Sequence, residues 1–144
     1  MFKMPSSKAQ HLPSLQVLLK DPAKLLFTFE DSKKIKLCCF DFLQRLEGPV
    51  VTDILEKESD NSDSVFLQEA SLTFVCINYQ DSQLKPISCE ILALQPNQQF
   101  KYKQRFRARL DGHNVRKLIR NGDFLVGFGP RDYFVFDQNL RTLS

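Results

Sequence analysis

The residues best suited to chemistry lie in one stretch, FKYKQRFRARL at positions 100–110. Every second residue is basic: Lys101, Lys103, Arg105, Arg107 and Arg109. Successive side chains of a β-strand point to opposite faces, so a strand here would carry all five charges on one face. They would stand about 6.6–7 Å apart, twice the rise per residue, which is close to the spacing of phosphates on an extended single strand. The stretch therefore predicts a basic ridge that can follow a nucleic-acid backbone.

Five like charges on one face repel one another, so a counter-charge is expected near them. A nucleic acid is one source, because each neutralised phosphate releases counterions and makes the affinity depend on salt. Acidic side chains are another source: on a neighbouring strand, in the acidic segment 56–63 of this chain, or on a partner protein. A third interpretation is a solvated strand face whose charges discourage aggregation at a sheet edge. The sequence leaves all three open.

The aromatic residues of this stretch are expected to point away from the basic face. Phe100, Tyr102 and Phe106 occupy the alternate positions, which face the core. Proteins that bind single strands usually add aromatic side chains on which bases stack. Such residues must come from elsewhere, and the candidates are Tyr79, Tyr133 and Phe134.

More basic residues follow the stretch and can widen the predicted surface: Arg116, Lys117, Arg120 and Arg131. They belong to an uneven distribution of charge. Residues 1–99 hold 10 Lys/Arg and 13 Asp/Glu, a net charge of −3, whereas residues 100–144 hold 10 Lys/Arg and 4 Asp, a net charge of +6. A local positive field of this kind carries information about partners rather than about the fold.

No pattern in the sequence indicates an enzyme. The sequence has no GxSxG, HExxH or P-loop motif, no CxxC pair, and no second histidine at metal-ligand spacing from His11 or His113. The four cysteines are predicted to be buried free thiols of a reducing compartment: Cys38, Cys39, Cys76 and Cys89. We therefore expect a non-enzymatic protein with no metal or cofactor.

The N-terminal stretch MFKMPSSKAQHLPSL has no continuous apolar segment and no cleavage site of small residues, so no signal peptide is expected. No apolar run approaches the roughly 20 residues that span a bilayer. We expect a nuclear or cytoplasmic protein that is not secreted and does not bind a membrane or a small-molecule substrate.

The elements that must position the basic strand follow from hydrophobic periodicity and turn residues. We predict one compact domain over residues 12–140. The expected parts of the chain are a disordered N-terminus (1–11), an N-terminal extension (12–58), an acidic loop (59–64) and a β-rich portion (65–144). The extension is expected to contain a helix at 12–20, a hairpin at 23–42 and a helix at 50–58. Within the last part we expect strands at 64–79, 87–94 and 100–110, a helix at 111–122, and strands at 123–129 and 133–137.

This order of three strands, one helix and two strands over residues 65–137 resembles the oligonucleotide/oligosaccharide-binding (OB) fold. The resemblance rests on the element order, on the helix at 113–121 and on the glycine-flanked strand LVGFG (125–129). It implies a mainly β protein with short helices and an OB-like barrel, with a helix between its third and fourth strands. A pleckstrin-like or other α+β barrel that begins with the hairpin stays open. In the OB fold the outer face of the second and third strands carries the ligand, and the basic strand is the third.

The resemblance implies a relation to nucleic-acid-binding subunits of the replication protein A and telomere-capping types, which work with partner subunits. Our leading hypothesis is a nucleic-acid-binding or scaffold subunit of a nuclear nucleoprotein complex that holds single-stranded nucleic acid, DNA or RNA, through the basic strand. The alternative is a protein–protein interaction adaptor without nucleic-acid contact. In that case the partner docks on the helix at 12–20, through Leu12, Leu15, Leu18 and Leu19, or on an exposed strand edge.

Overall fold

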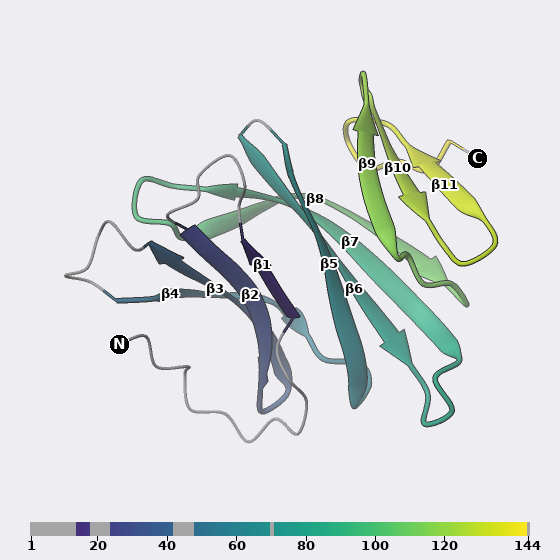
Figure 1. The fold of residues 1–144 in the computed structure, drawn as a ribbon, viewed down its shortest axis with the longest axis horizontal. Coiled ribbons are helices and arrows are strands. Elements are labelled where there is room, and N and C mark those ends of the chain that lie inside the picture. Colours follow the sequence, from purple (N-terminus) through teal and green to yellow (C-terminus); the bar gives the residue numbers. More distant parts are fainter. Residues whose placement is uncertain (1–13, 18–23, 42–47, 70, 144) are drawn as a thin grey trace. The chain divides into compact units, whose positions relative to one another are not determined.

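The computed structural model describes residues 14–17, 24–41, 48–69 and 71–143. Every helix or strand within these ranges is a β-strand, and the strands form three antiparallel sheets (Figure 1). The predicted mainly β class is therefore confirmed. Within the same ranges, no helix has the length and apolar composition needed to cross a membrane.

The chain divides into two units, and the first comprises residues 1–57 and 97–102. Its sheet has the strand order β1-β2-β3-β4, with β1 at Ser14–Val17, β2 at Lys24–Asp31, β3 at Lys34–Asp41 and β4 at Val50–Glu56. Strands β2 and β3 confirm the hairpin predicted at 23–42, and Ser32 in their turn has a positive φ of 61°. Phe27, Phe29 and Cys38 form the buried cluster of this unit.

Both helices predicted in the N-terminal extension are wrong in their described parts. The helix predicted at 50–58 is strand β4, in which Thr52 and Ile54 are buried and Asp53 is exposed. The β-branched run Val50, Val51 and Thr52 favours a strand once β3 is available for pairing. In place of the helix predicted at 12–20, residues 14–17 form β1, which pairs with β2. The rest of that helix and the N-terminus predicted to be disordered lie outside the described residues.

The second unit comprises residues 58–96 and 103–144, and it contains two sheets. The larger has the order β5-β6-β7-β8, with β5 at Asn61–Glu69, β6 at Leu72–Gln80, β7 at Pro86–Pro96 and β8 at Tyr102–Asp111, whose first residue belongs to the first unit. The smaller has the order β11-β10-β9, with β9 at Lys117–Asn121, β10 at Phe124–Phe128 and β11 at Tyr133–Phe136. The single strand predicted at 64–79 is a hairpin of β5 and β6, and β5 begins inside the predicted loop at 59–64.

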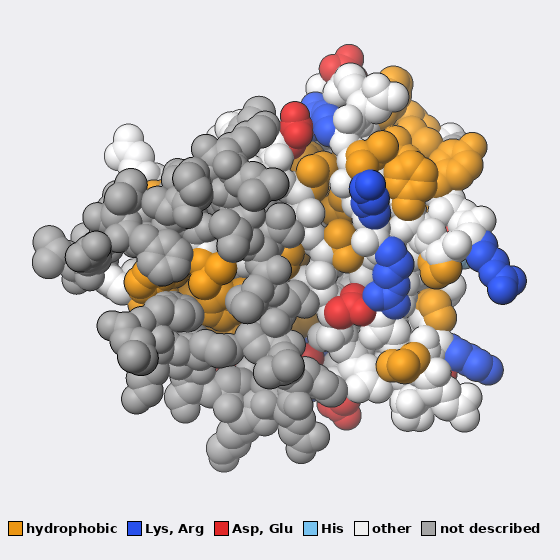
Figure 2. Space-filling model, viewed as in Figure 1, with side chains coloured by type: hydrophobic (Ala, Val, Ile, Leu, Met, Phe, Trp, Pro, Cys, Tyr) orange, Lys and Arg blue, Asp and Glu red, His pale blue; other side chains and the backbone are white. Residues whose placement is uncertain are grey.

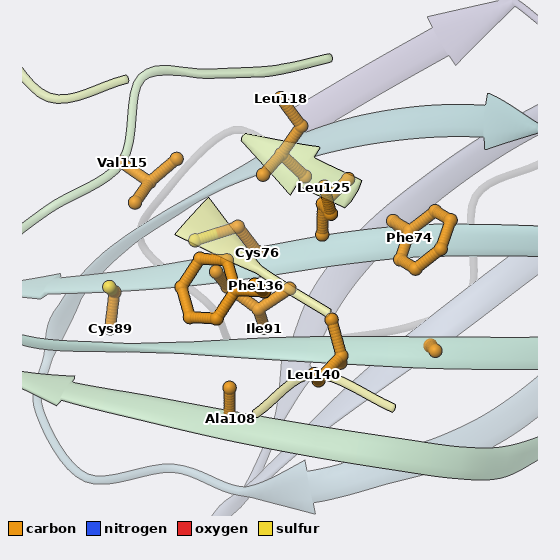
Figure 3. Close-up of a cluster of buried hydrophobic side chains, with 11 residues drawn as sticks. Phe74, Cys76, Cys89, Ile91, Ala108, Val115, Leu118, Leu125, Phe136 and Leu140 are labelled. Carbon is orange, nitrogen blue, oxygen red and sulfur yellow. The ribbon is translucent and has the colours of Figure 1, made fainter. Parts of the chain in front are cut away.

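The two sheets of the second unit share one hydrophobic core (Figure 3). Phe74, Cys76 and Ile91 come from the larger sheet, and Leu125 and Phe136 come from the smaller one. All four cysteines are free and buried, as predicted. The core fixes the inner face of β9–β11, so the opposite face of that sheet is its outer face.

The helix predicted at 111–122 is also wrong. After Gly112, whose φ is +75°, the chain runs without a helix into β9. Asn78 on β6 binds this segment at Val115: its Oδ1 accepts a hydrogen bond from Val115 N at 2.8 Å, and its Nδ2 donates to Val115 O at 2.7 Å. Both backbone groups that a helix would have to satisfy are thus bonded to a side chain instead.

Asn114 completes this anchoring. Its Nδ2 donates to the backbone oxygens of Ser88 at 3.1 Å and Tyr79 at 3.3 Å, and its Oδ1 accepts from Gln80 Nε2 at 2.9 Å. The side chain that was expected to cap a helix therefore ties the β8–β9 connection to two strands of the larger sheet. The Asn114 side chain is buried, so these bonds form away from water.

The three sheets are separate, and none of the described strands closes a barrel. The helix expected between the third and fourth strands of an OB-like barrel is not found among the described residues. The OB-like barrel predicted for 65–144 is therefore correct in its β content and wrong in its helix and in its closed barrel. The described strands do not close the barrel of the pleckstrin-like alternative either.

Candidate binding surfaces

Strand β8 has the alternation that the sequence predicts. Tyr102 and Ala108 are buried, and the basic residues between and beyond them are exposed: Lys103, Arg105, Arg107 and Arg109. Gln104, on the face expected to be inner, is exposed as well. Strand β8 is thus a half-buried strand with a basic outer face.

Two of these basic residues neutralise a buried carboxylate of the same chain. Glu90 lies on β7 with 2% of its side chain exposed, and its Oε1 accepts hydrogen bonds from Arg107 Nη2 at 2.6 Å and Arg109 Nη1 at 3.1 Å. Its Oε2 also lies 2.6 Å from Arg107 Nη2. A carboxylate removed from water needs charged partners of this kind. A neighbouring strand therefore supplies part of the counter-charge.

Arg109 has two further acidic partners. Its Nη1 donates to Glu58 Oε1 at 2.5 Å, and its Nε donates to Asp111 Oδ1 at 2.9 Å. The hydrogen bond to Glu58, followed by the one to Asp111, raises the pKa of the Arg109 guanidinium above its ordinary value. Glu58 belongs to the acidic segment 56–63, so that segment is a second source of counter-charge.

Three more predicted nucleic-acid ligands contact other groups of the same chain: Arg116, Arg120 and Lys101. Arg116 Nη1 donates to Asp63 Oδ2 at 2.6 Å. Arg120 Nε donates to Gly122 O at 2.9 Å, and its guanidinium carbon lies 6.0 Å from the centre of the Phe74 ring. In the first unit, Lys101 Nζ donates to the backbone oxygen of Val51 at 2.9 Å.

The remaining four predicted ligands have no ion pair within the described residues: Lys103, Arg105, Lys117 and Arg131. They belong to two places. Lys103 and Arg105 stand two residues apart on β8, whereas Lys117 lies on β9 and Arg131 in the turn between β10 and β11. The nine predicted ligands therefore do not form one continuous phosphate-binding ridge.

The leucines predicted to bind a partner fall mostly outside the described residues. Leu15 belongs to strand β1 rather than to a helix. Leu12, Leu18 and Leu19 lie outside the described residues. The docking helix is thus wrong at Leu15.

The outer face of β9–β11 was not predicted from the sequence as one surface, although two of its residues, Lys117 and Tyr133, were predicted separately as nucleic-acid contacts. Cross-strand pairing places Lys117, Phe128 and Tyr133 in one row, and Ile119, Val126 and Val135 in the next. Phe124 lies one row further along β10, paired with Asn121. We call the surface formed by these residues the aromatic face, and its members are Lys117, Ile119, Asn121, Phe124, Val126, Phe128, Tyr133 and Val135.

The aromatic face is exposed to an unusual degree for its composition. Tyr133 is 62% exposed, Phe124 46% and Phe128 37%, and the ring centroids of Phe128 and Tyr133 are 6.5 Å apart. Leu143 is also exposed and lies beside the face, since its N–H donates to Val135 O at 2.8 Å. Figure 2 shows hydrophobic side chains gathered on the surface over these strands.

The glycines of β10 and the turn after it explain which face is inner. A Cβ on Gly127 would lie 3.2 Å from both methyl carbons of Val115, and a Cβ on Gly129 would lie 3.0 Å from Asn114 O. The inner side of β10 therefore has little room for a side chain at Gly127, whereas Leu125 points into the core and Phe124 and Phe128 point outward. The available signal was the series Phe124, Val126 and Phe128 at alternate positions opposite Leu125 and Gly127, but a strand with two apolar faces is ordinarily buried.

His113 contacts two side chains of the same unit, Asp132 and Phe134. Its Nδ1 lies 3.3 Å from Asp132 Oδ2, and its ring meets that of Phe134 edge-on with centroids 4.9 Å apart. Within the described ranges, no group of three or more His, Cys, Asp or Glu residues is placed to hold a metal ion. Neither observation assigns a catalytic role or a metal ion to the binding surfaces.

No protein-family model, no curated protein and no solved structure matches this chain. The resemblance to OB-fold subunits stays a prediction, and function must be argued from the two surfaces themselves.

Proposed function

We propose that this chain is a non-enzymatic protein-interaction module that docks its partner on the aromatic face. The observation that carries the proposal is the exposure of Phe124, Phe128 and Tyr133 on one side of a three-stranded sheet. An antiparallel sheet with one face in water normally carries polar residues there. Exposed aromatic side chains gathered on one face favour a binding site, because aromatic residues are enriched in the cores of protein interfaces.

The surroundings of this face also favour binding. Val115, held at both backbone groups by Asn78, packs under Gly127 on the inner side of β10. A sheet fixed from below presents its aromatic residues with little freedom to lose on binding, and preorganisation of this kind improves affinity. Tyr133 adds a hydroxyl group to an otherwise apolar surface, which suits an interface that is partly wet.

Affinity capture with a matched control tests the proposal. The full chain is used as bait in nuclease-treated extract of cells that express it, beside Tyr133→Ser and Leu84→Asn. Leu84 is exposed in the β6–β7 turn, outside the aromatic face, with a positive φ of 65° that Asn tolerates. We expect the wild type and Leu84→Asn to recover the same protein and Tyr133→Ser to lose it. Recovery that does not depend on Tyr133 refutes the proposal.

Nucleic-acid binding is the second candidate, and Lys103 and Arg105 favour it. Both are exposed on β8, two residues apart, without an ion pair within the described residues. This spacing matches neighbouring phosphates of an extended strand. The candidate keeps the expected role in a nuclear nucleoprotein complex but reduces the contact to two cations. Titration of labelled oligonucleotides with the wild type and with Lys103→Glu/Arg105→Glu tests it, and unchanged binding by the double variant rejects it.

A further inference from the structure

We infer that the aromatic face binds a short extended peptide segment that has apolar side chains at alternate positions and carboxylates at one end. The inference rests on the proposed function and names the partner's chemistry. The carboxylates meet Lys117 and Arg131, and the apolar side chains lie over the rows led by Phe128 and Val126. Three observations carry it: the size of the face, the spacing of its rows and its charge.

The face is too small for a stable contact between two folded domains. Three strands about 4.8 Å apart and five residues rising about 3.4 Å each cover roughly 250 Å². A stable interface needs about 800 Å² from each partner. A second copy of this chain docked here would fall far short of that area, whereas one extended segment fits the face along β10.

The rows of the face have the spacing of an extended peptide. Phe124, Val126 and Phe128 stand two residues apart on one strand, about 6.6–7 Å between neighbours. An extended segment that lies along β10 presents its own side chains at the same interval. Alternate apolar side chains of that segment can therefore enter the gaps beside Val126, between the exposed rings.

The charges give the segment its second requirement. Lys117 pairs across the strands with Phe128, and Arg131 lies in the turn that joins Phe128 to Tyr133. Neither has an ion pair within the described residues. Asp132 in the same turn, whose Oδ2 lies 3.3 Å from His113 Nδ1, offsets one of these two positive charges. At the other end, Asp123 is exposed next to Phe124. The face is thus cationic at the Phe128–Tyr133 end, which favours carboxylates of the partner there.

Selection from a peptide library on phage tests the inference. The full chain is the target, and Tyr133→Ser is used to remove phage that bind elsewhere. Enriched peptides are synthesised, labelled and titrated by fluorescence anisotropy. We expect apolar residues at alternate positions with Asp or Glu at one end, and an affinity that falls about tenfold or more in Lys117→Glu/Arg131→Glu, which corresponds to about 1.4 kcal/mol.

Control variants keep the result interpretable. Lys85→Glu changes an exposed cation in the β6–β7 turn, outside the face, and should leave the affinity unchanged. Since Tyr133 and Lys117 are exposed, we expect all variants to keep the thermal unfolding midpoint of the wild type. A variant with a lowered midpoint is replaced by Tyr133→Gln or Lys117→Gln, for which the same losses of affinity are expected.

The outcomes separate the inference from the proposed function. Two results overturn the inference and leave the proposed function standing. In the first, the peptides whose binding depends on Tyr133 carry no acidic residue. In the second, their affinity is the same for the wild type and for Lys117→Glu/Arg131→Glu. Failure to enrich any peptide that needs Tyr133 overturns the inference, while the capture experiment decides the proposed function independently. Self-association abolished by Tyr133→Ser in sedimentation, or competition by an oligonucleotide at this face, assigns the face to another occupant and also overturns it.

Discussion

Glu90 lies inside the second unit with two arginines of β8 on its carboxylate. A buried ion pair contributes little to stability compared with an apolar replacement, yet removal of one partner leaves a charge without compensation. Arg107 and Arg105 stand on the same outer face of β8, and of these two residues Arg107 contacts Glu90 whereas Arg105 has no ion pair within the described residues. Neighbouring arginines of one strand thus have different contacts within the chain.

Replacement of these two arginines by methionine should separate their functions. Arg107→Met leaves Glu90 with Arg109 alone, and we expect it to lower the free energy of unfolding by about 1–3 kcal/mol, with the exposure of Arg107 favouring the lower end. Arg105→Met should change it by less than about 0.5 kcal/mol, as surface substitutions usually do. Urea unfolding of both variants measures the difference. Equal values for the two would contradict the assignment of Glu90 to Arg107.

Cys38 gives a prediction about alkaline pH. Burial raises the pKa of its thiol from 9.0 to about 12. Above pH 9 the unfolded chain releases this proton while the folded chain retains it. The free energy of unfolding is therefore unaffected by this thiol below pH 9 and falls between pH 9 and 12. Burial also raises the pKa of Tyr79, which adds a loss that begins near pH 10.

The alkaline prediction is checked by urea unfolding over this range of pH. The wild type should lose stability with a slope of at most about 1.4 kcal/mol per pH unit from Cys38. Cys38→Ala should be less stable at neutral pH because it leaves a small cavity, but its slope between pH 9 and 10 should be shallower. The comparison uses slopes, so the cavity does not affect it. Parallel curves for the two proteins would refute the contribution of Cys38.

At the scale of the elements, alternation and turn residues were sufficient for most strands of the chain. The hairpin at 23–42 and the strands at 87–94, 100–110, 123–129 and 133–137 follow from these local signals. The helices at 50–58 and 111–122 do not, because both stretches have apolar residues at helical spacing but find strand partners in the fold. Pairing with β3 and with β10 depends on residues distant in sequence, which a local pattern does not contain.

The same limit applies to the candidate surfaces. The basic face of β8 was predictable from alternation, but its neutralisation by Glu90 and Glu58 required the arrangement of β7 and the segment before β5. The aromatic face was not predicted, because Phe124 and Phe128 look like core residues in the sequence. Only the packing of Val115 against Gly127 shows that the opposite face of β10, with both Phe residues, points outward. Sequence thus predicts which face of a strand a side chain occupies more readily than what covers that face.

The β8–β9 connection gives a prediction at this scale. Asn114→Ala removes the hydrogen bonds to Ser88 O and Tyr79 O and leaves Gln80 without an acceptor at Asn114. Buried polar groups left without a partner cost about 1–3 kcal/mol each, so we expect a loss of at least about 2 kcal/mol. Thermal unfolding measures the loss, and hydrogen exchange should show the Val115 amide exchanging faster.

A surface amide provides the control for this substitution. Gln138→Ala changes an exposed residue in the turn after β11, and we expect its unfolding midpoint and its Val115 exchange rate to equal those of the wild type. If Asn114→Ala also left both quantities unchanged, the anchoring of the connection by Asn114 would be wrong.

At the scale of the whole molecule, the uneven charge of the sequence is reduced by pairing within the second unit. The acidic first part of the chain provides Glu58, Glu90 and Asp63, and these carboxylates bind arginines from the basic last part. The net charges of −3 and +6 along the sequence therefore overstate the positive field that a partner meets. Among the described residues, the predicted ligands without ion pairs are divided between β8, with Lys103 and Arg105, and the Phe128–Tyr133 end of the aromatic face, with Lys117 and Arg131.

This division predicts how any nucleic-acid binding should depend on salt. The logarithm of the binding constant falls with the logarithm of salt concentration by about 0.7 for each phosphate contact to a single strand. Lys103 and Arg105 alone give a slope of about −1.4, whereas all nine predicted ligands would give about −6. We expect labelled oligothymidylate to bind weakly with the shallow slope, and Lys103→Ala/Arg105→Ala to bring that slope close to zero. A slope steeper than about −4 would require the arginines now bound to Glu90, Glu58 and Asp63 to leave their carboxylates, and would restore the continuous basic ridge as the nucleic-acid site.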